Sequence, residues 1–79
     1  MKRQLIQTVR RSGLDSVRVS AALREMAACQ LEDVIELLRK RDWSDEHWTA
    51  YNSFLADVEQ DMATARVLYE DAHVVRESA

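Results

Sequence analysis

Few side chains of this 79-residue chain are suited to metal binding or nucleophilic chemistry: two histidines, His47 and His73, and one cysteine, Cys29. Glu70 and His73 form one E-x-x-H spacing, which puts a carboxylate and an imidazole on one helix face as in di-iron helical bundles. Such a site needs a second E-x-x-H and two further glutamates, but the residue three before His47 is Ser44. The single spacing therefore does not predict a metal site, and we expect His73 to be a solvated flanking residue.

Other motifs that carry enzymatic chemistry are missing from the sequence. It contains no glycine-rich phosphate loop, no H-E-x-x-H and no cluster of cysteine and histidine. Cys29 has no second cysteine for a disulfide, so we expect it to be buried or half-buried in a reducing compartment. These features predict a protein without enzymatic activity, catalytic residues, metal or cofactor.

The elements that position these side chains are predicted to be helices. The chain has no proline and one glycine, Gly13, and β-branched residues do not alternate with the period of a strand. Gly13 is expected to end the first helix in the left-handed conformation, and Asp15 or Ser16 to cap the second. We predict one all-α domain over residues 1–79, with helices at about residues 2–12, 15–41 and 45–75.

The connection between the second and third helices is short, which predicts that they form an antiparallel hairpin. Ser44 is suited to cap the third helix because its hydroxyl can accept from an exposed backbone N–H. Trp43, just before the cap, is expected to pack on Trp48 or Tyr51 as a hydrophobic staple. The first helix is too short to be stable alone and must dock on this hairpin.

The third helix carries an apolar stripe that predicts its packing surface. Apolar side chains recur there at alternating spacings of three and four, and we call them the predicted seam: Trp48, Tyr51, Leu55, Val58, Met62, Ala65, Tyr69 and Ala72. A stripe with this period must lie against another helix. We interpret it as the spine of the hairpin, with Phe54 and Leu68 beside it and Asp61 interrupting them.

The second helix has a wider apolar arc than one neighbour requires. Its apolar residues span about half the helix circumference: Val19, Leu23, Met26, Ala27, Leu31, Val34, Ile35, Leu37 and Leu38. A chain of this length also buries only about 60% of its unfolded surface. We therefore predict a second neighbour outside the chain, either another copy or a different protein, that completes a helical bundle.

Charge is distributed unevenly along the chain, whose net charge is −3. Residues 1–24 carry six basic side chains and one acidic one, whereas the remainder carries five basic and thirteen acidic ones. One explanation is that the basic first helix folds onto the acidic third helix. The alternative is a free basic surface for nucleic acid or an acidic partner.

A helix-turn-helix-like segment, residues 5–24, is the basis of the nucleic-acid alternative. Side chains at Ser16, Arg18, Ser20 and Arg24 would face a DNA groove. Arg10 and Arg11 would contact phosphates. The second helix is much longer than a recognition helix, and the sequence pI near 5.3 opposes nonspecific DNA binding. We therefore place this function second.

Several short stretches resemble a known family. They are Leu31-Glu32-Asp33-Val34-Ile35-Glu36, Trp43-Ser44-Asp45-Glu46, Tyr51, Ser53 and Leu68-Tyr69-Glu70-Asp71. Together they resemble, over about half the chain and with one gap, the Hha/YmoA family of small helical modulators that bind nucleoid-structuring proteins. The family's aspartate before a basic pair and its C-terminal tryptophan have no counterpart here. The resemblance implies that a role in gene regulation would act through a protein partner.

The sequence thus favours a small adaptor, inhibitor or regulatory protein, such as phages and plasmids carry, that works by protein–protein contact. Aromatic side chains commonly anchor such interfaces, and the predicted partner-binding residues are Trp43, Trp48, Tyr51, Phe54 and Leu37. The alternative is a transcriptional or nucleoid-associated regulator. No stretch approaches 18 apolar residues, so we expect a cytoplasmic protein without a membrane partner.

Overall fold

A computed structural model describes residues 1–78, and the side chains of residues 1–73, as three helices. They are α1 (Arg3–Ser12), α2 (Ser16–Leu38) and α3 (Asp45–Ser78), with no strand in this part of the chain. The predicted all-α class is therefore confirmed. The molecule measures 55 × 19 × 16 Å, and its radius of gyration of 15.8 Å exceeds the roughly 12 Å of a compact domain of this length.

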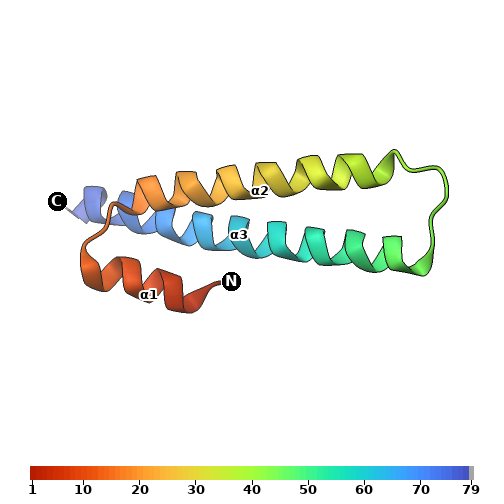
Figure 1. Ribbon diagram of the computed structural model, residues 1–79. Helices are drawn as coiled ribbons and strands as arrows, with labels where there is room; N and C mark the ends of the chain where they lie inside the picture. The colour runs from red at the N-terminus through yellow and green to blue at the C-terminus, as the bar shows by residue number, and fades with distance from the viewer. Residues whose placement is uncertain (79) are drawn as a thin grey trace.

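Helices α2 and α3 lie side by side as an antiparallel hairpin, and α1 docks near its open end (Figure 1). α1 runs in the same direction as α3, because Lys2 contacts Asp61 and Arg10 contacts Asp71. This short helix therefore covers part of one side of the hairpin, and the hairpin turn extends well beyond it.

The helix ends follow the local chemistry of the sequence. Gly13 ends α1 with a φ of 68°, as predicted, and the Asp15 carboxylate caps α2 by accepting from the N–H groups of Val17 and Arg18. α2 ends at Leu38, three residues before the predicted boundary. The Trp43 indole N–H donates to the Leu37 carbonyl at 3.1 Å, so the last turn of α2 is closed by the loop instead of by further helix.

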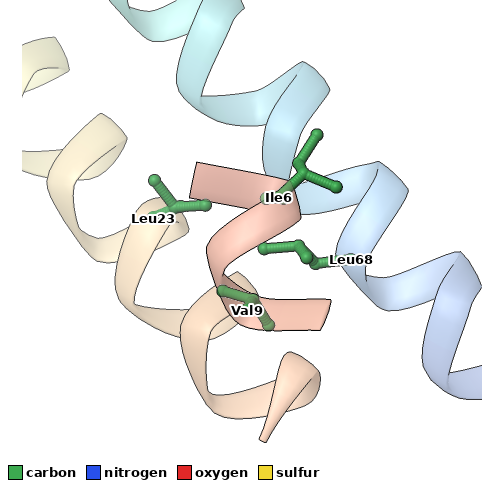
Figure 2. Close-up of a cluster of buried hydrophobic side chains, with 5 residues drawn as sticks. Ile6, Val9, Leu23 and Leu68 are labelled. Carbon is green, nitrogen blue, oxygen red and sulfur yellow. The ribbon is translucent and has the colours of Figure 1, made fainter. Parts of the chain in front are cut away.

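The core lies where all three helices meet. Ile6 and Val9 of α1 pack with Leu23 of α2 and Leu68 of α3 (Figure 2), and Ala65 completes this cluster. These five side chains are at most 4% exposed. Burying Ile6 and Val9 here is what holds α1 in place, since an isolated helix of ten residues is unstable in water.

The predicted seam of α3 is wrong at three of its positions. Trp48, Met62 and Tyr69 are 44–56% exposed, whereas α3 buries Leu68 and two polar residues, Asp61 and Thr64. For Met62 and Tyr69 the cause is α1, which packs beside α2 on the part of α3 between Asp61 and Asp71. Trp48 lies beyond α1, near the turn, where it packs on Trp43 and Tyr51. Over its C-terminal half α3 therefore packs against both α1 and α2, and the buried stripe of α3 is rotated toward α1.

Cys29 is exposed, which contradicts the predicted burial. Leu23 and Ala27 of α2 face the core, and at 100° per residue Cys29 lies more than 100° away from both around the helix. Position on the helix therefore overrides the general tendency of free cysteine to be buried.

Candidate protein-binding surface

Four aromatic rings gather at the turn of the hairpin. Trp43 meets Trp48 edge-on with ring centroids 4.8 Å apart, and Tyr51 lies 5.9 Å from Trp43 and 6.0 Å from Trp48. The His47 ring stacks on Trp43 at 6.1 Å. Because Trp43 precedes the N-cap and Trp48 is the fourth helical residue, the predicted hydrophobic staple is confirmed.

His47 has a structural role at the start of α3 that sequence reasoning missed. Its Nδ1 accepts a hydrogen bond from the backbone N–H of Ser44 at 3.0 Å and lies 2.9 Å from the Ser44 hydroxyl oxygen. It thus makes the bond that the glutamate makes in a capping box, whereas the Ser44 hydroxyl contacts His47 instead of capping a backbone N–H as predicted. Asp45 and Glu46 add negative charge at the positive end of the helix dipole. This local network fixes the aromatic rings relative to the helix.

The five predicted partner-binding residues differ in how exposed their side chains are. Trp48 is 56% exposed, while Trp43, Tyr51 and Phe54 are half-buried and Leu37 is buried. Trp48 is therefore available to a partner, and Leu37 is part of the hairpin interior.

A larger apolar surface runs along the hairpin beside this cluster. Six exposed apolar side chains, which we call the open face, come from both helices: Leu31, Ile35 and Leu38 of α2, and Trp48, Met62 and Tyr69 of α3. They are six of the nine large apolar side chains that are exposed in the described part of the chain. The wide apolar arc of α2 was the sequence signal for half of this surface.

Contacts between the helices show that these residues share one side. Ser20 of α2 donates its hydroxyl proton to the Ala65 carbonyl at 2.7 Å, and a groove lies between Ser20 and Arg24 on α2 and Met62 and Tyr69 on α3. At 100° per residue, Leu31, Ile35 and Leu38 project within about 40° of the Arg24 direction, and Trp48 projects within about 40° of Met62. The groove and the open face therefore belong to the same side of the hairpin.

α1 occupies the opposite side through two ion pairs. Lys2 Nζ lies 2.7 Å from Asp61 Oδ1, whose side chain is 2% exposed, and the Lys2 backbone N–H donates to Thr64 Oγ1 at 2.8 Å. Arg10 binds Asp71 with two hydrogen bonds of 2.7 and 2.9 Å. These bonds lower the pKa of Asp71, partly opposed by desolvation, and raise the pKa of Arg10. The basic first helix is thus packed on the acidic third helix.

The arginines predicted for nucleic-acid contact are not brought together as one free set. Arg10 is bound to Asp71, and Arg18 Nε lies 3.9 Å from the Asp15 carboxylate. Arg11 and Arg24 are exposed, and Arg24 lines the groove on the open face. Ion pairs within the folded chain therefore neutralise part of the positive charge on which the predicted DNA binding depends.

Within the described residues, no group of three or more histidine, cysteine, aspartate or glutamate side chains could hold a metal ion. His73 is half-buried and meets Tyr69 edge-on at 4.1 Å, so it is not the fully solvated residue expected. No helix in this part of the chain is long and apolar enough to cross a membrane. No family model, curated protein or solved structure matches the chain.

Proposed function

We propose that this chain is a non-enzymatic protein–protein interaction module that binds its partner through the open face. The observation that supports this proposal is the placement of six exposed apolar side chains along one side of a two-helix hairpin. Large contiguous apolar surfaces of this kind mark interaction sites in soluble proteins. Completion of a helical bundle by the partner would give each helix of the hairpin a second neighbour.

The turn supplies an anchor for such a partner. Trp48 is 56% exposed but is held by Trp43 and Tyr51, so little side-chain freedom remains to be lost on binding. Leu38 is equally exposed, at 56%, and approaches the same end of the hairpin. A partner helix that covers both would bury Trp48, whose residue type is enriched among interface anchors, together with the apolar Leu38 side chain.

Photo-cross-linking in the native host tests the proposal. A photoreactive residue in place of Ile35 is compared with one in place of Met26, since the two are 48% and 49% exposed on the same helix. They are nine residues apart and therefore project in opposite directions from α2. We expect protein adducts from position 35 and few from position 26. Equal labelling from both, or none from position 35, would refute the proposal.

A further inference from the structure

The open face belongs to a hairpin whose surface is too large for a compact monomer. The chain exposes 6152 Å², whereas a compact monomer of its mass exposes about 4,900 Å². The open face extends roughly 32 Å along α3, from Trp48 to Tyr69, and spans two helices that are each about 10 Å across, so it covers at most about 640 Å². Two such faces together would bury about 1,300 Å², which lies at the lower end of the range of stable interfaces.

The inter-helix register shows which residues lie level with one another on this face. The Ser20–Ala65 hydrogen bond and the shared groove of Arg24 and Met62 fix the alignment of the antiparallel pair. Continued toward the turn, the same alignment sets three apolar pairs side by side: Leu31 with Leu55, Ile35 with Tyr51, and Leu38 with Trp48. Apolar side chains are therefore concentrated at the turn end, whereas arginines lie at the open end, where Arg24 and Arg66 line the groove.

We infer that the open face is occupied by a second copy of this chain, related by a two-fold axis along the hairpin. α2 of each copy then lies on α3 of the other, with both turns at the same end. The inference rests on the proposed function and names its partner. In this arrangement the apolar turn ends cover each other, and Arg24 and Arg66 of both copies meet at the open end, where Arg66 is paired with Glu70 of its own chain. Turns at opposite ends would instead set Trp48 against the Arg66 end of the partner.

Charges along the rim of the open face support the same orientation. With α2 on the partner's α3, Arg24 comes within one helical turn of Glu59 of the second copy, and Arg39 comes within one turn of Asp45. The two-fold axis repeats each pair, so four opposite-charge pairs line the edges of one bundle. All four of these side chains are exposed in the single chain. Complementary rim charges of this kind set the register and orientation of helical bundles.

Sedimentation equilibrium of the purified chain at micromolar concentration tests the identity of the occupant. We expect twice the single-chain mass of 9.2 kDa. Ile35→Lys should weaken association at least about 100-fold, because two lysines would enter an apolar interface. The matched control Met26→Lys should leave the dimer intact, and circular dichroism should show that both variants remain helical. A wild-type species of 9.2 kDa would overturn the inference.

Orientation is tested by spin labels at the turn, using Asp42→Cys in a Cys29→Ala background. Turns at the same end predict a distance of about 20–30 Å between labels, close to the width of the bundle. A distance near the 55 Å length of the molecule would overturn the proposed orientation. Arg24→Glu and Glu59→Arg should each weaken association by about threefold to tenfold, and the double variant should restore it. If the double variant instead associates as weakly as the product of the two single effects predicts, this orientation is also wrong.

Failure of this inference can be distinguished from failure of the proposed function. If position 35 cross-links only to a different protein and the purified chain is a monomer, the inference of a second copy is wrong, but the proposed interaction surface is supported. If position 35 gives no adduct and the purified chain is a monomer, both are wrong.

Discussion

Lys2→Met removes the ammonium group that lies 2.7 Å from Asp61 Oδ1 but keeps most of the side-chain volume. The Asp61 carboxylate is 2% exposed and would be left without this partner. Removing one partner of a fully buried pair costs about 3–5 kcal/mol. Since the Lys2 side chain is 41% exposed and thus partly screened by water, we expect a smaller loss of about 2 kcal/mol.

Urea denaturation followed by circular dichroism, at one protein concentration for all variants, measures this loss. With a slope of about 1 kcal/mol per molar urea, the midpoint should fall by roughly 2 M. Arg3→Met is the matched control, because Arg3 is the exposed residue next to Lys2, at the start of α1. The backbone hydrogen bond from Lys2 to Thr64 is retained in both variants, so it does not contribute to the difference.

A double-mutant cycle separates the ion pair from other effects of the substitution. Asp61→Asn removes the buried charge. In that background Lys2→Met should therefore lower the free energy of unfolding by only about 1 kcal/mol or less. If Lys2→Met is no more destabilising than Arg3→Met in the wild type, then Lys2 does not neutralise Asp61 and our description of α1 docking is wrong.

Other residues give predictions that are measured in the same way. Leu68→Ala should destabilise the fold by about 3 kcal/mol, because Leu68 is fully buried where the three helices meet, and a loss below 1 kcal/mol would contradict that core. Gly13→Ala should cost about 1 kcal/mol, since φ is 68° although no atom lies within 4 Å of the added methyl group; an unchanged unfolding midpoint would contradict this strain. The pKa of Asp71 is lowered by Arg10, so its contribution to stability is present above the unfolded pKa of about 3.9 and is lost as the pH falls through the folded pKa. Arg10→Ala should therefore reduce the acid sensitivity of the fold, and identical pH profiles would exclude this role.

The sequence was sufficient to predict the fold class and most helix ends because these depend on local chemistry. Gly13, Asp15 and Trp43 act within a few residues of themselves, and each has the role that its type predicts. The end of α2 was placed too late because its last turn is closed by a hydrogen bond from Trp43, which depends on the path of the loop.

The packing surface of α3 could not be read from its apolar pattern alone. A heptad stripe assumes one neighbour along the whole helix, but α1 adds a second neighbour over the C-terminal half. Asp61, which interrupted the pattern in sequence, is buried because Lys2 reaches it from a position 59 residues away in the chain. The exposed Met62 and Tyr69 are the corresponding residues that this rotation leaves on the open face.

The candidate surface was predicted in part. The aromatic residues at the turn were named from their types, and the wide apolar arc of α2 indicated a missing neighbour. Whether Met62 and Tyr69 remain exposed depends on the side to which α1 docks, and α1 is held there by the buried Ile6 and Val9 and by the Lys2–Asp61 pair. The other four residues of the open face lie nearer the turn, beyond α1, and their exposure follows from the packing of α2 on α3.

The most direct test of the account is an intermolecular cross-link from the centre of the open face. A photoreactive residue in place of Ile35 is introduced into an isotopically light chain, which is mixed with a heavy chain, and the products are mapped by mass spectrometry. We predict light–heavy adducts on α3 of the other copy, around residues 48–55. Adducts confined within single chains, or directed to the outer side of α2, would contradict the account.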